Sequence, residues 1–314
     1  MIIQVSAHPF GECGSKPKMI LEDSSFAIKY NPFKRRLTEQ DIPILCKDAS
    51  GIVAGTEPYT KDVLKQCTNL KVISRVGVGY DNVDLDYCNS NNIIVTYTPD
   101  APSPGVAELT VANILNLARS IVVANNNTKG KNWKRIIGTL LEENIIGILG
   151  VGRIGKRVIK LLQPFNPVIY ACDLQPDLEF GKQYNVNWVS HEDLFESCDI
   201  ISVHVPLNEM NRDLVSFDEL NQMKKGSYLI NTSRGPIVNE QAVLQAIQSD
   251  KLAGFAADVF THEPYSGKLI EYPNVILTPH IGASTYKTRF LMELGAAMDC
   301  VRVLSGQSPL NPIN

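Results

Sequence analysis

The chain contains, from Ile145 to Val158, the stretch IIGILGVGRIGKRV, an apolar run that leads into closely spaced glycines. The apolar run predicts a buried strand and the residues after it predict a helix, so Gly150, Gly152 and Gly155 lie in a strand-to-helix turn. In such a turn the first glycine permits a tight bend and the second lets the backbone approach a diphosphate. The third lets the helix pack against the strand. The helix N-terminus adds free amides and a positive dipole end, which favour phosphates. This stretch predicts a dinucleotide-binding fold.

A second strand and an acidic residue follow at the spacing that this fold requires. The run from Val168 to Ala171 predicts the strand, and Asp173 comes shortly after it, about 20 residues beyond the glycine turn. A carboxylate at this place accepts hydrogen bonds from the ribose hydroxyls of NAD and repels the additional phosphate of NADP. We therefore predict NAD as the cofactor.

Strand and helix patterns alternate along most of the 314 residues. Predicted strands cover Ile2–Ser6, Phe26–Tyr30, Gly51–Ala54, Val72–Arg75, Ile93–Thr96, Ile145–Leu149, Val168–Ala171, Ile200–Val203, Tyr228–Asn231, Gly254–Ala257 and Val275–Leu277. Predicted helices cover Thr60–Cys67, Val106–Ala124, Gly155–Leu162, His191–Ser197, Asn239–Ser249 and Tyr286–Leu304. Continuously apolar strands between helices predict parallel sheets covered on both faces. At about 150 residues per domain, we predict an α/β protein with two doubly wound parallel-sheet domains.

The segment from Val106 to Ala124 differs from the other predicted helices because apolar residues cover nearly all of its faces. Such a helix must be buried on all sides. The pattern predicts either an interdomain core helix or a helix at a subunit interface.

Three polar motifs follow later predicted strands: NTSRGP at 231–236, DVFTHEP at 258–264 and TPHIGA at 278–283. Since ligands of open α/β sheets bind beyond the carboxyl ends of the strands, we expect Arg234, Glu263 and His280 to lie close together near the nicotinamide. The guanidinium of Arg234 can bind a carboxylate and a 2-oxygen. His280 can exchange a hydroxyl proton near neutral pH, and Glu263 can orient its imidazole. This chemistry suits hydride transfer to or from a 2-hydroxy acid.

Composition excludes several other classes of protein. Apolar residues make up 44% of the chain and the net charge is −3, so neither nucleic acid nor an anionic membrane is an expected partner. The N-terminus has no signal-peptide layout. Seven scattered cysteines without a CxxC motif favour a reducing, cytoplasmic location. Neither HExxH nor Cys/His ligand spacing is present, and we predict no metal site.

Taken together, the motifs resemble those of the D-isomer-specific 2-hydroxyacid dehydrogenase family, particularly its phosphoglycerate-dehydrogenase-like branch. The resemblance covers nearly the whole chain and includes NLKVISRVGVGYDNVD at 69–84 and VAELT at 106–110. It implies a flavodoxin-like substrate-binding domain formed by residues 1–100 and 285–314. It also implies a Rossmann NAD-binding domain formed by residues 101–284, and a homodimer.

The resemblance also implies roles for individual residues. Arg234, Glu263 and His280 would be catalytic. Backbone amides around Val78 and Gly79 would bind the substrate carboxylate, and we add Arg75 as a further candidate for substrate binding. The glycine turn and the resemblance together give these cofactor-binding candidates: Gly150, Gly152, Arg153, Ile154, Gly155, Asp173, Val205, Pro206, Thr232, Asp258 and Gly282.

One loop departs from the resemblance. Phosphoglycerate dehydrogenases of this type often carry an Arg-Ser pair after the strand that matches Gly51–Ala54, where this chain has GTEP at 55–58. The change removes a phosphate-binding cation and adds a negative charge. Arg75 and the basic residues at 34–36 remain as candidate phosphate ligands.

Three functions are compatible with these observations. The first is an NAD-dependent dehydrogenase acting on a small D-2-hydroxy acid, with 3-phosphoglycerate and phosphohydroxypyruvate as one candidate pair. The second is a glyoxylate/hydroxypyruvate reductase or another 2-ketoacid reductase. The third, from a different class, is an NAD-sensing corepressor-like binding protein, which would bind NADH without transferring hydride.

Overall fold

A computed structural model describes all residues of the chain, from 1 to 314. The chain forms two compact units. The first consists of Met1–Pro102 and Ser284–Asn314, and the second of Ser103–Ala283.

The first unit is built on a five-stranded parallel sheet in the order β2-β1-β3-β4-β5. The strands are β1 (Ile2–Val5), β2 (Ala27–Tyr30), β3 (Gly51–Ala54), β4 (Val72–Arg75) and β5 (Ile94–Thr96). This is the flavodoxin-like strand order, in which the winding direction reverses between β1 and β3. The carboxyl ends of those two strands therefore flank a crevice, which is where such folds bind ligands.

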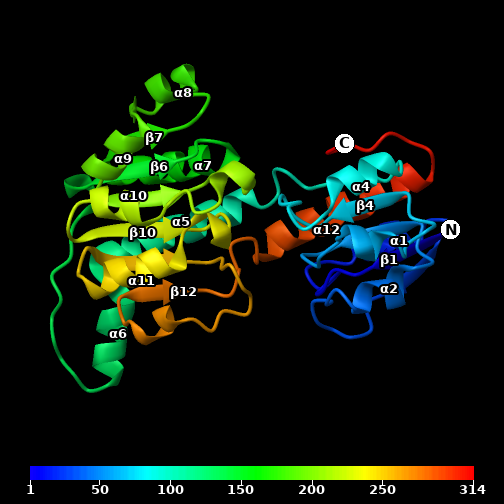
Figure 1. The fold of residues 1–314 in the computed structure, drawn as a ribbon, viewed down its shortest axis with the longest axis horizontal. Helices are drawn as coiled ribbons and strands as arrows, with labels where there is room; N and C mark the ends of the chain where they lie inside the picture. Colours follow the sequence, from blue (N-terminus) through cyan, green and yellow to red (C-terminus); the bar gives the residue numbers. More distant parts are fainter. The chain divides into compact units, whose positions relative to one another are not determined.

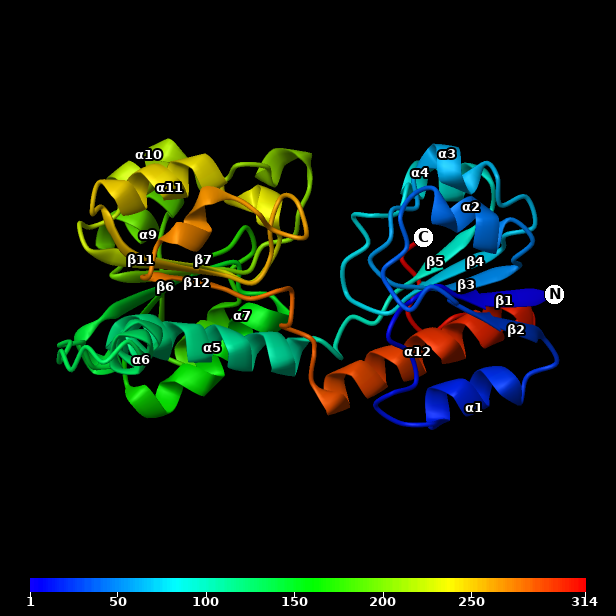
Figure 2. The ribbon, with the colours of Figure 1, turned by 90° about the horizontal axis from the view of Figure 1, so that it is seen from below.

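Helices cover both faces of this sheet (Figure 2). One face carries α1 (Lys16–Glu22) and α12 (Tyr286–Leu304), and the other carries α2 (Asp41–Cys46), α3 (Lys61–Leu64) and α4 (Leu85–Ser90). The core between the sheet and α2–α4 includes Ile52, Ile73 and Val95, all of them buried. Because both faces are covered, the central strands β3 and β4 are buried at every residue, whereas the edge strand β2 is mostly exposed.

The second unit is built on a seven-stranded parallel sheet in the order β12-β11-β10-β9-β6-β7-β8. The strands are β6 (Ile145–Leu149), β7 (Val168–Cys172), β8 (Val186–Trp188), β9 (Ile200–Val203), β10 (Ser227–Asn231), β11 (Leu252–Ala257) and β12 (Val275–Leu277). Counted from β6, this is the Rossmann order 3-2-1-4-5-6 with one further strand. The winding direction reverses between β6 and β9. The predicted fold class, two doubly wound parallel-sheet domains of Rossmann and flavodoxin-like type, is confirmed.

The helices of the second unit also lie on both faces of its sheet (Figures 1 and 2). They are α5 (Ser103–Arg119), α6 (Ile121–Lys129), α7 (Arg153–Leu162), α8 (Leu178–Gln183), α9 (His191–Ser197), α10 (Phe217–Gln222) and α11 (Glu240–Gln248). α5 and α7 cover one face, and α9, α10 and α11 cover the other. Each face has its own cluster of buried apolar side chains.

The prediction of one buried helix from Val106 to Ala124 is wrong. α5 ends at Arg119, and Ser120 adopts a left-handed conformation with φ of +49°. α6 then leaves at a bend of 63° and contains no buried residue. The returning chain explains the end of α5, because the amide of Thr139 donates to the carbonyl of Ala118, 3.0 Å away, in place of a helical donor.

Every strand predicted from the sequence is present, and the structure adds β8 and the short helices α1, α2, α4, α8 and α10. These added helices have only six or seven residues, too few for a clear apolar period. By length and composition no single helix could cross a membrane. Only α5 and α6 counted together across their bend meet that criterion.

Candidate active site

The predicted catalytic and cofactor residues of the second unit gather along one edge of its sheet. All of them except those on α7 lie on loops that follow the carboxyl ends of strands. Along the sheet these are His280 and Gly282 after β12, Asp258 and Glu263 after β11, Thr232 and Arg234 after β10, Val205 and Pro206 after β9, the glycine turn after β6, and Asp173 after β7. Parallel pairing of adjacent strands brings these loops to the same edge.

The glycine turn has the geometry that a diphosphate requires. Gly150 has a φ of +91°, and a side chain there would meet Val205 at 2.8 Å. A Cβ on Gly155 would lie 2.2 Å from the carbonyl oxygen of Gly150, so the start of α7 packs directly on the turn. Gly152 is the N-cap of α7 and has no side chain that could cap the helix. A Cβ at this position would meet no atom within 4 Å. The N-terminus of α7 thus has open space beside Gly152, and a helix N-terminus is a favourable place for an anion.

Arg153 and Ile154 form the first turn of α7. Arg153 is exposed, and Ile154 is half-buried against the apolar cluster beneath α5 and α7. Asp173 lies at the end of β7 and is half-buried. Its Oδ2 accepts from the amide of Val151 at 2.7 Å and its Oδ1 from the amide of Gln175 at 2.9 Å. The first of these hydrogen bonds joins the acidic residue to the glycine turn.

His280 and Glu263 form a hydrogen-bonded pair. The carboxylate Oε2 of Glu263 accepts from Nδ1 of His280 at 3.1 Å, and both side chains are partly exposed. Oε1 of Glu263 accepts from the amide of Phe260 at 3.1 Å, which fixes the carboxylate on its own loop. Because Nδ1 is paired with Glu263, Nε2 is the ring nitrogen left to exchange a proton.

Asp258 is 1% exposed and binds the loop that carries His280. Its Oδ1 accepts from the hydroxyl of Thr278 at 2.6 Å and the amide of Ile281 at 2.8 Å. Its Oδ2 accepts from the amide of Gly282 at 2.7 Å. These contacts hold His280 in a left-handed conformation, with φ of +54°. Asp258 and Gly282, which are predicted to bind the cofactor, thus also take part in positioning the histidine.

Arg234 lies in the loop after β10 and is half-buried. Asn231 shapes this loop, since its side chain donates to the carbonyl of Arg234 at 2.9 Å and accepts from the amide of Ser233 at 3.1 Å. The next residue, Gly235, lies against the loop of Glu263. A Cβ on Gly235 would come within 1.9 Å of the carbonyl carbon of Phe260. Only glycine allows the loops of Arg234 and Glu263 to approach this closely.

Other predicted cofactor residues lie between the glycine turn and Arg234. Val205 packs on Gly150, and Pro206 is exposed. Thr232 is buried, and its hydroxyl shares a 2.9 Å hydrogen bond with that of Thr110 on α5. Thr110 and Thr278 position site residues, yet neither was predicted, because a single threonine carries no sequence signal of its contacts.

His204 is a further residue at this edge. Its Nε2 lies 2.9 Å from the hydroxyl of Ser202, and its Nδ1 is buried without a partner. Burial lowers the pKa of His204 to about 3, so the ring is neutral near neutral pH. No cluster of three or more His, Cys, Asp or Glu side chains in the chain could hold a metal ion.

The predicted substrate residues belong to the first unit. Arg75 ends β4 and is 3% exposed. Its Nη1 donates to the carbonyl of Ala54 at 3.0 Å and its Nε to the carbonyl of Gly79 at 3.1 Å. Val78 and Gly79 are half-buried in the loop that follows β4. Arg75 therefore fixes the shape of the loop whose amides were predicted to bind a carboxylate.

The chain was compared with families of known proteins. The family model described as D-isomer specific 2-hydroxyacid dehydrogenase, NAD binding domain, matches residues 111–282, more than half of the chain. This match spans the glycine turn and the loops of Arg234, Glu263 and His280.

Individual relatives agree with this match. D-3-phosphoglycerate dehydrogenase of Bacillus subtilis is 35% identical over 266 residues, which are 84% of this chain and 51% of that protein. The chain spans about half the length of the D-3-phosphoglycerate dehydrogenases that it matches. Glyoxylate reductase of Thermofilum pendens is 35% identical over 82% of this chain and 79% of its own length. The crystal structure of D-lactate dehydrogenase from Aquifex aeolicus, complexed with NAD and lactic acid, superimposes with a TM-score of 0.87 at 27% identity, over 100% of this chain and 99% of that one.

Proposed function

Because this chain belongs to the D-isomer-specific 2-hydroxyacid dehydrogenase family, we propose that it interconverts a small D-2-hydroxy acid and its 2-oxo acid with NAD as the cofactor. The observation that carries this proposal is the His280–Glu263 hydrogen bond on loops adjoining that of Arg234. A proton donor, its orienting carboxylate and a guanidinium are the groups that reduction of a 2-oxo acid needs.

Each of the three residues has a defined task in this proposal. Nε2 of His280 donates a proton to the carbonyl oxygen during reduction and accepts it back during oxidation. Glu263 holds the ring so that Nε2 faces the substrate, and it stabilises the imidazolium. Arg234 binds the substrate's carboxylate and 2-oxygen through its planar N–H donors, which positions the carbonyl carbon.

The second unit has residues that are suited to bind NAD. The N-terminus of α7, where Gly152 leaves open space, would bind the diphosphate, and Asp173 would bind the ribose hydroxyls. The carboxylate of Asp173 accepts a hydrogen bond from the amide of Val151, so it faces the glycine turn. When bound, NAD supplies the hydride acceptor or donor for the reaction.

The test is an assay of NADH oxidation with glyoxylate, pyruvate, hydroxypyruvate, phosphohydroxypyruvate and 2-oxoglutarate. We expect at least one of these acids to be reduced, and we expect His280→Ala to abolish most of that turnover while still binding NADH. NADH binding without turnover of any acid would contradict the proposal. That result would favour the corepressor-like alternative.

We also propose that the protein is a homodimer assembled through α6 and the loop after it. This segment projects from the body of the second unit (Figure 1) and carries the exposed side chains of Ile121 (52%), Trp133 (84%), Ile137 (97%) and Leu140 (54%). So much exposed apolar surface on one segment is typical of a protein interface. A second copy of the chain is the simplest occupant, since closed symmetric dimers are the commonest oligomers.

The dimer is tested by light scattering of the purified protein. We expect a dimer for the unchanged chain and a monomer for a Trp133→Glu/Ile137→Glu variant. Arg135→Gln, which changes an exposed polar residue of the same loop, should remain dimeric. A monomeric unchanged protein would rule this proposal out.

We propose a cytoplasmic location as well. All seven cysteines are free thiols, and five of them are buried. Unpaired buried thiols are typical of reducing compartments. Fractionation of cells that express the tagged protein would test this, with recovery in a membrane or periplasmic fraction as the contrary result.

A further inference from the structure

Glu263 lies in the loop that follows β11, and contacts within the second unit fix this loop. Oε1 of Glu263 accepts from the amide of Phe260 at 3.1 Å, while Oε2 accepts from Nδ1 of His280, also at 3.1 Å. The amide of Thr261 donates to Oε1 of Glu240, the first residue of α11, at 2.9 Å. The carboxylate of Glu263 therefore joins the backbone of its own loop to the proposed catalytic histidine.

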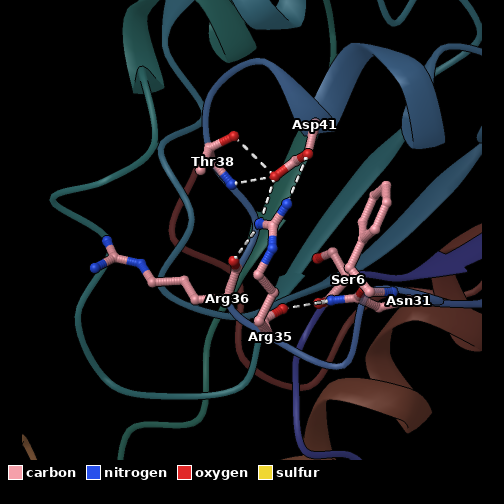
Figure 3. A network of polar contacts seen from close by, with 7 residues as sticks. Ser6, Asn31, Arg35, Arg36, Thr38 and Asp41 are labelled. Atoms are coloured by element: carbon pink, nitrogen blue, oxygen red, sulfur yellow. Dashed lines mark hydrogen bonds and ion pairs between the residues drawn. The ribbon is translucent and has the colours of Figure 1, made fainter.

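The first unit contains a similar turn that is held in a different way. Asp41 accepts from the amide three residues before it, that of Thr38, at 2.7 Å, and Glu263 makes the same kind of contact in its own loop. Figure 3 shows that the oxygens of Asp41 are also engaged by the hydroxyl of Thr38 and the guanidinium of Arg35, both in that same loop. Glu263 instead directs one oxygen to another loop, so further contacts are needed to keep its own loop rigid.

Two aromatic rings supply such a contact. The rings of Phe260 and Tyr265, which flank Glu263 in the sequence, are stacked with their centroids 4.4 Å apart and their planes at 25°. Phe260 is 8% exposed and belongs to the apolar cluster on the α9–α11 face of the sheet, against which Tyr265 packs. Aromatic pairs at such separations attract each other beyond the effect of the apolar area that they bury. Glu263 thus lies inside a short segment whose two ends are stacked on each other.

The ring of Tyr265 lies against Gly267. A Cβ added to Gly267 would lie 2.3 Å from Oη of Tyr265 and 2.6 Å from its Cζ, so the ring occupies the space that a side chain would need. The φ of Gly267 is −79°, which any residue can adopt. It is therefore the ring of Tyr265, and not the backbone, that requires a glycine at this position.

These contacts form a continuous path from Tyr265 to His280. The ring of Tyr265 packs on that of Phe260, and the amide of Phe260 donates to Oε1 of Glu263. Oε2 of Glu263 then accepts from Nδ1 of His280. A change in the position of Phe260 would therefore move the carboxylate relative to the imidazole.

We propose that Tyr265 is a positioning residue for the hydrogen-bonded pair of Glu263 and His280. Its ring fixes Phe260, and the amide of Phe260 fixes the carboxylate. This inference rests on the proposed dehydrogenase activity, and it adds to that site a residue that acts through others.

Steady-state kinetics of two substitutions at Tyr265 tests this role. Tyr265→Ala removes the ring and should lower kcat about tenfold for any acid that the enzyme reduces, because small displacements of catalytic groups reduce the rate. The KM of that acid and the dissociation constant of NADH should change little. Tyr265→Phe keeps the stacked ring and should retain a nearly normal kcat.

Gly267→Ala displaces the same ring without removing it. The three atoms nearest to the new methyl group all belong to Tyr265, so this variant should also lose about tenfold in kcat. In the Tyr265→Ala background the methyl group meets no ring, and the two losses should therefore not add. If Tyr265→Ala does not fold, Gly267→Ala alone still tests the position of the ring.

Tyr184→Ala is the matched control. Tyr184 is half-buried like Tyr265, and its ring centroid lies 4.6 Å from that of another phenylalanine of the second unit, Phe180. This variant removes a similar aromatic contact at a different place in the same unit, so its kcat should stay normal.

A second measurement does not depend on turnover. In NMR spectra of the protein with isotope-labelled histidine, the Nδ1 proton of His280 reports the hydrogen bond to Glu263, and His280→Ala identifies its signal. We expect Tyr265→Ala and Gly267→Ala to shift this signal, and Tyr265→Phe and Tyr184→Ala to leave it in place. Because the spectra need no substrate, they test the inference independently of the proposed function.

The outcomes are distinct. A normal kcat and an unshifted His280 signal in a folded Tyr265→Ala protein would overturn the inference and leave the proposed function standing. Equal losses from Gly267→Ala in the presence and absence of the tyrosine ring would overturn it as well. Turnover of none of the five acids, with the His280 signal still shifted in Tyr265→Ala, would refute the proposed function and keep the effect of the ring on the histidine.

Discussion

At His280 the backbone is held in the left-handed region, which costs a residue other than glycine about 1–3 kcal/mol. The carboxylate of Asp258 offsets this cost. It accepts three hydrogen bonds from Thr278, Ile281 and Gly282, on both sides of the histidine. Hydrogen bonds to a charged group contribute about 1.5–3 kcal/mol each. The strained position of the imidazole is therefore stable, and it places the ring within reach of Glu263.

Replacing His280 by alanine should lower kcat about 10²- to 10⁴-fold, the usual contribution of a general acid. The dissociation constant of NADH should change little. Glu263→Gln keeps the acceptor for the Phe260 amide but offers an amide where Nδ1 of His280 needs an acceptor, so we expect a smaller loss, about 10²-fold. Steady-state kinetics and NADH titration measure both effects. Near-normal turnover in His280→Ala would remove the histidine from the mechanism.

His204 should make the protein sensitive to mild acid. Its pKa is about 3 when folded, because of burial, and about 6.5 when unfolded. Between these values only the unfolded chain binds the proton, so this contribution to stability is complete above about pH 6.5 and falls as the pH decreases. From about pH 7.5 to 5.5 the loss is about 1.4 kcal/mol in the free energy of unfolding.

Urea unfolding of His204→Gln at both pH values would test this. The variant should lose about 1.4 kcal/mol less than the unchanged protein over the same interval. His262→Gln, at an exposed histidine, should behave like the unchanged protein. Equal pH dependence in all three proteins would show that folding does not lower the pKa of His204.

The sequence predicted which residues gather at this site but not how they are held. Arg234, Glu263 and His280 each follow a predicted strand, and strand ends of a parallel sheet lie together, so their proximity could be inferred. The position of His280 also depends on Asp258, whose partners are two backbone amides and one hydroxyl. Backbone amides leave no trace in a sequence, so this positioning role could not be predicted.

At the scale of elements, most strands were predictable because burial on both faces gives them nearly continuous apolar runs, as in β3, β6 and β9. The error at the end of α5 has a tertiary cause. The residues from Ile121 to Ala124 are as apolar as those before them, but Ser120 breaks the helix and Thr139 binds its last turn. That contact joins residues about 20 positions apart, and the periodicity of apolar residues within one helix cannot reveal it.

Gly235 should be essential because it lets two loops of the site approach each other. In Gly235→Ala the new methyl group would lie within 2.5 Å of three backbone atoms of Phe260 and Thr261. Backbone cannot yield as a flexible side chain does, so the loops of Arg234 and Glu263 must separate. Small displacements of catalytic groups cost about 10²-fold in rate.

We therefore expect about a 10²-fold loss of kcat in Gly235→Ala, with a smaller change in NADH affinity. Gly226→Ala is the matched control for a glycine of the same unit, since it has open space around it, although its φ of +83° adds local strain. That control should lose some thermal stability and keep its kcat. A Gly235→Ala enzyme with normal kcat would show that the close approach of the loops is not needed for catalysis.

At the scale of the whole molecule, the two units have separate cores. Both apolar clusters of the second unit consist only of residues between Ala107 and Leu277. The cluster of the first unit consists of residues from Leu37 to Val95, with Ile313 of the C-terminal segment packed against it. The alternation of strand and helix patterns, together with the length of the chain, predicted two domains. Only the family resemblance predicted that the C-terminal segment returns to the first unit. The sequence of α12 predicts a helix, but it does not show which of the two sheets that helix packs against.

The separate cores predict that the second unit folds alone. A fragment of residues 103–283 retains all seven strands of its sheet, both covering layers of helices and the glycine turn with Asp173. It should unfold in one cooperative transition and bind NADH with nearly the affinity of the full chain, because it contains every predicted cofactor residue. It should reduce none of the 2-oxo acids, since it lacks Arg75, Val78 and Gly79, the residues predicted to bind the substrate. Calorimetry and NADH titration check the first two expectations. A fragment that lacks a cooperative transition, while the full chain has one, would mean that the second unit depends on the first for its stability.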